Sequence, residues 1–348
     1  MSITNSAHLF ISFTSLVNLQ RYCAGVVTLT AVSKMTFLSL NSTIQMKLIK
    51  VAICHYPHVM KSAVYGLEEL FFLADRICIE ESLNTRFTTH VATFTSAVKG
   101  DYNIVLLPPS VSSDFYLTPD PQLLAWLNKQ HRQGAVIASA CAGAFILAAS
   151  GLSHQRLLTT HWGLTEEFKR HFPNQPVDTR KILIDHNDIM SAGGMMSWLD
   201  LGLELVKKYS GHLVMRKLGK TLVVDTAQRE QSYYHQFQPN FQHGDDAVQR
   251  AQQYINIHYG HNISIADLAD IALLTQRTLQ RRFAKVLGLN PNQYLQRFRV
   301  QKMCDLLEST SKPFDWIAHQ VGYEDTTACR KVFNKYMGLT PSEFRKRF

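Results

Sequence analysis

The stretch AVIASACAGAFILAASG, residues 135–151, changes character at its centre. Its first part is a short, continuous apolar run, which is typical of a strand buried on both faces of a parallel sheet. From Gly143 onward the residues suit a helix, so the stretch predicts a strand, a tight turn and a helix. Cys141 lies at the turn, where several enzyme families display a nucleophile and other α/β proteins pack a small apolar residue. The stretch alone leaves both roles open for Cys141.

Strand–helix pairs of the same kind lie on both sides of this stretch. They occur at residues 47–55 and 64–77, at 102–109 and 120–134, and in the two short strands of 181–194 with the helix of 195–209. Short apolar strands that alternate with helices of this length are typical of a parallel sheet covered on both faces. We therefore predict an α/β domain over residues 46–210, called the front domain below.

The last hundred residues differ, because they are predicted to be helical throughout and contain an internal repeat. The two copies are residues 263–291 and 312–341. Corresponding positions are 49 residues apart in the first helix of each copy and 50 apart in the second. The extra residue falls in the turn between the helices, where an insertion disturbs packing least. Residues 245–348, called the rear domain below, are thus predicted to form an all-α domain with two helix-turn-helix subdomains.

The second helix of each copy has a polar face that suits contact with DNA. In the first copy Leu279 and Phe283 mark the apolar face, and Thr275 is the expected N-cap. The opposite faces carry Gln276, Arg277, Gln280 and Arg281 in the first copy, and Thr326, Thr327, Arg330 and Lys331 in the second. Arg and Gln can pair with base edges in the major groove, and cationic side chains can neutralise phosphate. One such helix would indicate only a solvated surface, whereas two with the same layout favour DNA binding.

The charge of the whole chain suits a polyanionic partner. Lysine and arginine number 36 against 27 aspartate and glutamate, which gives a net charge of +9 and a sequence pI of about 9.2. Residues 245–348 hold 15 basic and 10 acidic residues, so the excess there is modest and lies on particular helix faces. The chain has no C-x-x-C pair and no H-E-x-x-H motif, so neither a disulfide framework nor a metal site is expected.

Two segments lie outside the predicted domains. Residues 1–45 carry no pattern linked to the first strand, and we expect a poorly ordered extension or a misassigned start before Met46. Residues 211–244 are predicted to be a linker, because much of their sequence is polar, aperiodic and rich in glutamine and tyrosine. No stretch reaches the ~18 consecutive apolar residues of a membrane span, so no membrane partner is expected.

The rear domain resembles the DNA-binding domain of AraC-family transcription regulators. The resemblance rests on IADLA…TQRTLQRRFAKVLGLNPNQYLQRFRVQKMCDLL and on IAHQVGYEDTTACRKVFNKYMGLTPSEFRKRF, with the G-L-x-P motif in both. It implies double-stranded promoter or operator DNA as the partner. It also implies base contacts from Arg277, Gln280, Arg281, Thr326, Thr327, Arg330 and Lys331. Cys329 is smaller than the apolar residue usual in the family, which implies a looser second subdomain.

The front domain resembles the class I glutamine amidotransferase-like superfamily, in its PfpI-like branch, which implies a flavodoxin-like sandwich around a parallel sheet. The resemblance rests on VAICHYP, YNIVLLPP, AVIASACAGAFILAASGLSHQRLLTTHW and SAGGMMSWLDLGLELV. Catalytic relatives use a cysteine at a strained turn with a histidine and often an acid, and the matching residues are Cys141 and His161. Ala63 stands at the acid's position, and Ala142 stands where many hydrolytic relatives have histidine. Cys141 and His161 are therefore expected to be vestigial or to line a ligand pocket, without a cofactor.

These predictions describe a cytoplasmic, nucleoid-associated transcription regulator rather than an enzyme. The front domain is expected to sense a small-molecule effector or to mediate homodimerisation, and the rear domain to bind a promoter. RNA polymerase is a further expected partner. The alternative is a cysteine-dependent amidase or hydrolase that carries a DNA-binding tail. An RNA-binding adaptor has little support, since no platform of aromatic side chains for single-stranded RNA is visible.

Overall fold

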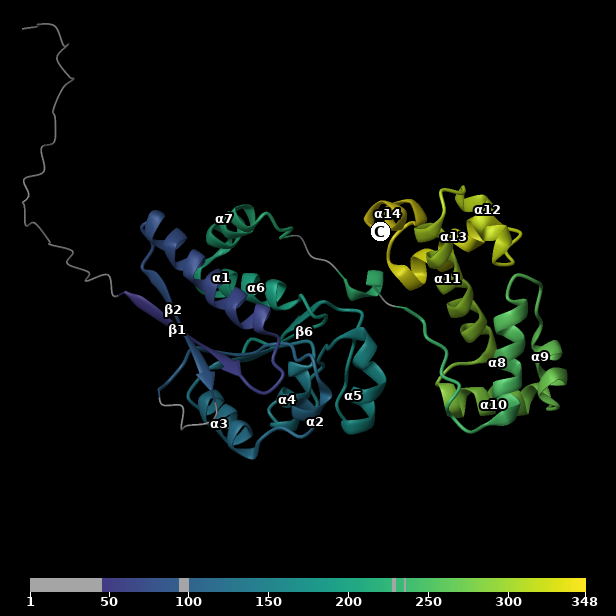
Figure 1. Cartoon of the computed structure of the whole chain (residues 1–348), viewed down its shortest axis with the longest axis horizontal. Coiled ribbons are helices and arrows are strands. Elements are labelled where there is room, and N and C mark those ends of the chain that lie inside the picture. The colour runs from purple at the N-terminus through teal and green to yellow at the C-terminus, as the bar shows by residue number, and fades with distance from the viewer. Residues whose placement is uncertain (1–45, 94–99, 227–229, 235) are drawn as a thin grey trace, which may run out of the picture. The chain divides into compact units, whose positions relative to one another are not determined.

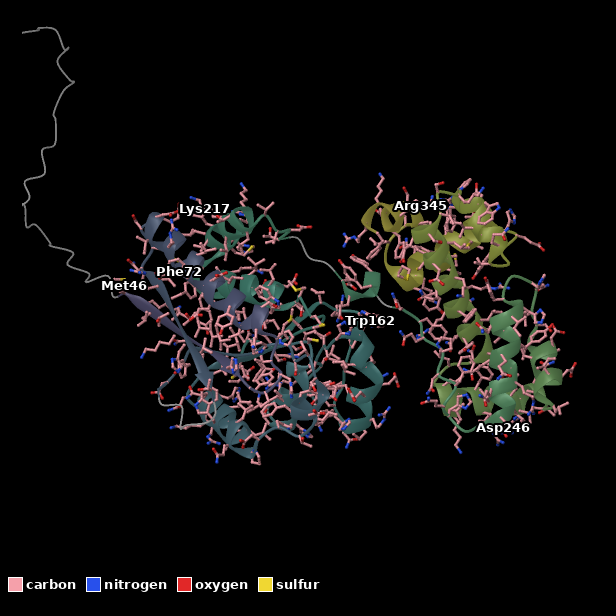
Figure 2. The ribbon with its side chains drawn as sticks, in the orientation of Figure 1. Met46, Phe72, Trp162, Lys217, Asp246 and Arg345 are labelled. Atoms are coloured by element: carbon pink, nitrogen blue, oxygen red, sulfur yellow. The ribbon has the colours of Figure 1, made fainter. Side chains whose placement is uncertain are left out.

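The computed structural model describes residues 46–93, 100–226, 230–234 and 236–348 (Figure 1). The description begins at Met46, which is labelled in Figure 2 and directly precedes the first strand. The extension or misassigned start expected for residues 1–45 lies outside the described residues.

The described part of the front domain is built on a six-stranded sheet with the order β2-β1-β3-β4-β6-β5. The strands are β1 (Lys47–His55), β2 (Thr85–Thr93), β3 (Ile104–Leu107), β4 (Val136–Ala140), β5 (Leu183–Asp185) and β6 (Ile189–Ala192). All neighbouring pairs are parallel except β5 and β6, which form an antiparallel hairpin. Strands β3 and β4 are buried along their whole length, as their continuous apolar sequences predict.

Helices cover both faces of this sheet, which confirms the predicted α/β sandwich (Figure 1). One face is covered by α1 (Lys61–Glu80), α6 (Trp198–Ser210) and α7 (His212–Leu222). The other face carries α2 (Ser113–Leu117), α3 (Pro121–Arg132), α4 (Gly143–Ala149) and α5 (Thr165–His171), with the short 3₁₀ helix η1 (Trp162–Leu164) before α5. A single apolar core extends through these layers.

Strand β2 and helix α7 are the longest of the front-domain elements that were not predicted from the sequence. Strand β2 lies at the edge of the sheet and is mostly polar, so it lacks the apolar run that marks the inner strands. Helix α7 occupies the first part of the segment predicted as a linker, residues 211–244. It is an element of the front core, because Val214 and Leu218 are buried and Lys217 pairs with Glu81 at the end of α1 (Figure 2). The linker is therefore shorter than predicted.

The described part of the rear domain is all helical. Its helices are α8 (Asp246–His258), α9 (Ile265–Ala272), α10 (Gln276–Leu287), α11 (Pro291–Ser309), α12 (Phe314–Gln320), α13 (Thr326–Met337) and α14 (Pro341–Arg347). They enclose two apolar cores, one around α9 and α10 and the other around α12 and α13. Helix α11 contributes to both cores, through Phe298 to the first and Val300 to the second. The two helix-turn-helix units are thus the two copies of the sequence repeat.

The repeated G-L-x-P motif ends one helix and starts the next. Gly288 and Gly338 are the C-caps of α10 and α13, with left-handed φ angles of 66° and 71° that favour glycine. Three residues later Pro291 and Pro341 occupy the first turns of α11 and α14, where a missing N–H costs nothing. The motif therefore fixes the same helix connection in both subdomains.

The two copies differ in the turn that precedes the second helix of each helix-turn-helix unit. Leu273 adopts a left-handed φ of 56° with its side chain 81% exposed, and Gly322 occupies the matching place with φ 82°. A Cβ on Gly322 would collide with the Arg299 guanidinium and touch the backbone of Gly260. The second copy thus needs glycine for both space and conformation, whereas the first copy holds a strained leucine in open solvent.

Replacing Leu273 by glycine should stabilise the chain by about 0.5–1 kcal/mol, since relief of backbone strain exceeds the entropy that glycine adds to the unfolded state. Urea denaturation followed by circular dichroism measures this difference. Gly322→Leu is the matched reverse change and should destabilise the chain. Equal stability of Leu273→Gly and the parent would contradict the assignment of strain to this turn.

Candidate functional site

The predicted DNA-contacting face of α10 is open to solvent. Leu279 and Phe283 are buried against the first core, while Arg277, Gln280 and Arg281 are exposed on the other side of the helix. Thr275 caps the helix as expected, with its hydroxyl accepting the N–H of Thr278 at 3.2 Å. No ion pair holds either arginine within the part of the chain that the structure describes.

The neighbouring arginine of α10 has a different role. Arg282 forms two hydrogen bonds of 2.7 Å with the carboxylate of Asp245, the N-cap of α8. This paired contact lowers the pKa of Asp245 below its usual value. Arg282 thus connects α10 to α8. It does not belong to the exposed face that carries Arg281, although the two residues are adjacent in sequence.

Helix α13 presents a second face of the same kind. Thr327, Arg330 and Lys331 are exposed, and Thr326 is half-buried. Cys329 lies on the buried side, with its sulfur 3.3 Å from the sulfur of Met303.

Arg330 is held within its own subdomain. It pairs with Asp315 of α12 at 3.1 Å and lies 4.8 Å above the ring of Phe314. Both charged groups of this pair are more than half exposed, so opening it to meet a base or phosphate costs little. The two faces therefore differ, since Arg277 and Arg281 of α10 have no ion pair to give up among the described residues.

In the front domain, the turn at Cys141 has the sharp geometry of a strand-to-helix elbow. Cys141 has a left-handed φ of 54°, and its N–H donates to the carbonyl of Ala192 at 2.8 Å. The Thr160 hydroxyl donates to the Cys141 carbonyl, also at 2.8 Å. A Cβ on Gly143 would collide with the carbonyl oxygen of Leu107, so only glycine fits there. These contacts hold the strained residue in place.

The surroundings of Cys141 do not suit a nucleophile. The residue is 3% exposed, and burial raises the pKa of its thiol to about 12, so it is neutral at physiological pH. Burial also lowers the pKa of His161, whose Nδ1 accepts the N–H of Gly163 at 3.0 Å. Among the described residues the imidazole makes no hydrogen bond to the thiol. Ala63, at the expected acid position, is fully buried and provides no carboxylate.

A buried glutamine anchors the start of the interdomain linker to this region. Gln231 opens the 3₁₀ helix η2 (Gln231–Tyr234) and is only 1% exposed. Its amide donates to the carbonyl oxygens of Thr160 and Lys181 at 2.9 and 3.1 Å, and accepts the N–H of Trp162 at 3.0 Å. Its backbone N–H donates to Arg180. Thr160 is thus shared between the Cys141 turn and the linker, although no sequence pattern indicates a role for Gln231.

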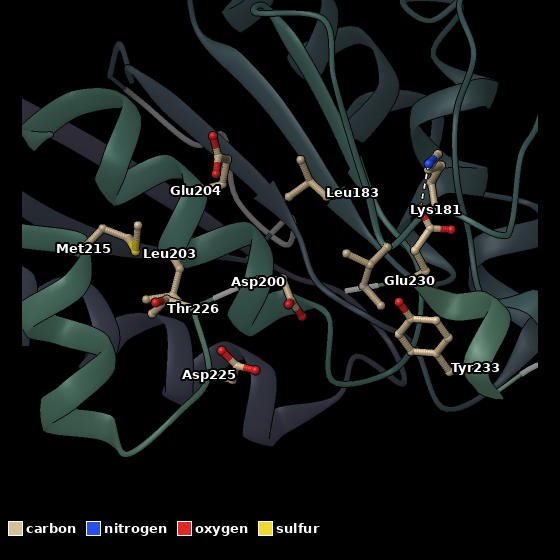
Figure 3. Close-up of a pocket in the computed structure, with 11 residues that line it drawn as sticks. Lys181, Leu183, Asp200, Leu203, Glu204, Met215, Asp225, Thr226, Glu230 and Tyr233 are labelled. Atoms are coloured by element: carbon tan, nitrogen blue, oxygen red, sulfur yellow. Dashed lines mark hydrogen bonds and ion pairs between the residues drawn. The ribbon is translucent and has the colours of Figure 1, made fainter. Parts of the chain in front are cut away.

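The side chain of Gln231 requires glycine at position 193, and the residues beside Gln231 border a pocket. A Cβ on Gly193, just after β6, would collide with the amide nitrogen of Gln231. Beside the anchor, Lys181 forms an ion pair of 2.6 Å with Glu230, and together with Asp200 and Tyr233 they border a pocket of about 540 Å³ (Figure 3). The linker therefore forms one wall of a pocket whose other walls come from α6, α7 and β5.

Gln231→Ala should release the linker, because it removes the hydrogen bonds by which the buried amide holds Thr160, Lys181 and Trp162, at a cost of about 1–3 kcal/mol. Limited proteolysis should then cut residues 223–245 faster than in the parent chain. Gln242→Ala is the matched control, since Gln242 is an exposed glutamine of the same linker. Equal cleavage rates in the two variants would show that Gln231 does not anchor the linker.

The described residues offer neither a metal site nor a membrane span. Within them no group of three or more His, Cys, Asp and Glu side chains could hold a metal ion. No helix in the described part of the chain is both long and apolar enough to cross a membrane.

Comparison with known proteins gives two family matches. A helix-turn-helix domain model matches residues 268–347, and a DJ-1/PfpI family model matches residues 75–208. Similar curated proteins include the HTH-type transcriptional regulator GbdR of Pseudomonas aeruginosa, 26% identical over 227 residues, which are 64% of this chain and 61% of the relative. The regulator CdhR of the same species is 24% identical over 65% of this chain and 67% of its own. The match to GbdR thus covers less than two thirds of that regulator.

Similarity extends to single domains and to solved structures. The lactose operon transcription activator of Staphylococcus xylosus is 34% identical over 104 residues, 30% of this chain and 37% of the relative. A putative transcriptional regulator from Vibrio parahaemolyticus is 21% identical, with a TM-score of 0.45, over 51% of this chain and all of the other. The C-terminal domain of AraT, a response regulator from Geobacillus stearothermophilus, is 30% identical, with a TM-score of 0.29, over 29% of this chain and 85% of that one.

Proposed function

We propose that this chain, which joins a DJ-1/PfpI domain to an AraC-type helix-turn-helix domain, is a transcription regulator that binds a specific promoter. The observation that carries the proposal is the pair of exposed polar faces on α10 and α13, each on the second helix of a helix-turn-helix unit. Such a helix fits the major groove, and two of them in one domain suit successive grooves roughly 10 bp apart.

The bases are read by side chains of both helices, which are exposed except for the half-buried Thr326. In α10 these are Arg277, Gln280 and Arg281, and in α13 they are Thr326, Thr327, Arg330 and Lys331. Arginine donates paired hydrogen bonds to guanine, and glutamine can pair with adenine, so the first helix supplies direct readout. Cationic side chains of both helices, Lys331 among them, can also neutralise phosphate, which fixes register without reading sequence.

Arg281→Ala should weaken binding to the native operator by about 1–3 kcal/mol and relax the sequence preference at one position. Arg282→Ala is a matched control from the next residue: it should lower the melting temperature, because it breaks the pair with Asp245, but leave sequence preference unchanged. Mobility-shift titrations on operator variants measure both. If the sequence preference for DNA changes in Arg282→Ala but not in Arg281→Ala, the proposed DNA-contacting face of α10 is wrong.

The front domain supplies effector sensing and assembly into a homodimer. Helix α1 supports the second role, because Tyr65, Phe72 and Ile79 are each more than half exposed at intervals of seven residues. This spacing places them on one face of the helix, and Figure 2 shows the position of Phe72. An apolar stripe that pairs with its own copy would give a two-fold dimer and a doubled DNA site.

Phe72→Asp should convert the dimer to a monomer, because it places a charge at the centre of the apolar stripe. Sedimentation velocity at micromolar concentration measures the change in mass. Ile257→Asp, at a residue of α8 that is 72% exposed, is the control and should leave the mass unchanged. A parent chain that sediments as a monomer would refute the dimer, and an unchanged dimer in Phe72→Asp would refute this interface.

We assign no catalytic role to Cys141 and His161, which line a ligand pocket or remain as relics of a hydrolytic ancestor. The thiol is buried, its pKa is raised, and it has no hydrogen bond to an acid or base among the described residues, which supports this assignment over the amidase or hydrolase alternative. Turnover that disappears in Cys141→Ser would overturn it. The regulator acts in the cytoplasm, on the nucleoid, where RNA polymerase is its further partner.

A further inference from the structure

A second pocket of about 820 Å³ lies in the front domain, and Cys141 is not among the described residues that line it. It is bordered by His55, Tyr56, His58, Lys61, Phe115 and Asp120, together with apolar residues of the same loops. We propose that this pocket is the effector site, and that its ligand is a small organic anion with an aromatic or apolar body. The inference rests on the proposed regulatory function and names the ligand class that it requires.

The walls of the pocket suit an apolar body. The rings of Tyr56 and Phe115 are stacked, with centroids 5.2 Å apart and planes within 10°. Val111 borders the pocket and is 64% exposed, although it is apolar. An aromatic wall with an exposed aliphatic side chain is the environment in which a flat or apolar ligand gains most from leaving water.

The polar groups of the pocket favour a negative charge on the ligand. Lys61 is exposed at the first position of α1 and has no ion pair among the described residues. His55 and His58 add two groups that can donate hydrogen bonds to an anion. The one carboxylate, Asp120, is the N-cap of α3 and accepts the N–H of Gln122 at 2.8 Å. Asp120 is therefore committed to its helix, while Lys61 is free to pair.

The pocket is preformed by contacts between two loops. The carbonyl of His58, a residue with a left-handed φ of 61°, accepts the N–H of Val111 at 2.9 Å and the hydroxyl of Ser110 at 3.0 Å. These loops follow β1 and β3, which are adjacent in the sheet. The loop after β1 leads to α1 on one face of the sheet, and the loop after β3 leads to α2 on the other face. Ligands of open α/β sheets bind at such a point, outside the carboxyl ends of the strands.

The pocket is also linked to the linker anchor by an unbroken series of contacts. The Tyr56 hydroxyl donates to the carbonyl of Pro108, and Gly143 packs against the adjoining Leu107 carbonyl. Gly143 follows Cys141, whose carbonyl is held by Thr160, and Thr160 in turn accepts Gln231. A ligand that shifts Tyr56 therefore acts on the same edge of the sheet that holds the linker.

Three probes with one indole ring test the ligand class, namely indole-3-acetate, indole-3-acetamide and tryptamine. Binding of each to the full-length chain is measured by calorimetry, without DNA. The acetate should bind, and the neutral amide and the cationic amine should bind at least about tenfold more weakly, since they lack the charge that Lys61 pairs with. Lys61→Met should reduce acetate affinity about tenfold and Lys61→Arg should restore it.

Lys220→Met, at an exposed lysine of α7 outside this pocket, is the matched control and should bind the acetate like the parent. Equal binding of acetate and amide, preferred binding of tryptamine, absence of binding by all three, or unchanged affinity in Lys61→Met would each overturn the proposal. Operator binding is measured separately by mobility shift. If the chain binds operator DNA but does not prefer the acetate over the other two probes, the pocket proposal alone is refuted. If it prefers the acetate but does not bind operator DNA, the regulatory function is refuted.

Discussion

Parallel pairing of five strands is the constraint on which the front domain depends. It brings the carboxyl ends of β1, β3, β4 and β6 to one edge of the sheet, so the loops after these strands must pack against one another. The aromatic pocket, the Cys141 turn and the linker anchor all lie along this edge, although they come from distant parts of the sequence. Features that look unrelated in the chain are therefore neighbours in the fold.

The same packing supports the structural role that we propose for Cys141. The hydrogen bonds that hold its left-handed backbone also enclose the residue, and burial keeps the thiol protonated. A working nucleophile in such a turn needs a thiolate and a base that takes its proton, and among the described residues no hydrogen bond joins the Cys141 thiol to His161. These contacts favour the structural role that the sequence left open.

Much of this fold could be predicted from the sequence, because inner strands and repeated helices carry strong local patterns. β4 is continuously apolar, and the G-L-x-P motif encodes a C-cap and an N-terminal proline at fixed positions. The edge strand β2 and the helix α7 were missed, since each owes its place to packing rather than to a strong pattern of its own.

Some functional residues depended on contacts that no local pattern shows. Helical periodicity assigns Arg281 and not Arg282 to the predicted DNA-contacting face, but only the structure shows that Arg282 pairs with Asp245, 37 residues away. Gln231 belongs to a polar segment with no periodicity, and its burial depends on backbone groups about 50 and 70 residues earlier. Long-range polar contacts of this kind cannot be read from composition or spacing.

Helix α11 has a consequence for how the rear domain meets DNA. Phe298 and Val300, two residues apart, belong to different cores, so one continuous helix carries both subdomains. Each residue added to a regular helix rotates the second subdomain by about 100° relative to the first and moves it about 1.5 Å along the axis. The number of residues in α11 therefore sets the rotational phase between α10 and α13, the two helices proposed to contact DNA. A single insertion there would turn α13 away from the side of the duplex that α10 contacts in this proposal, while leaving every proposed base-contacting residue intact.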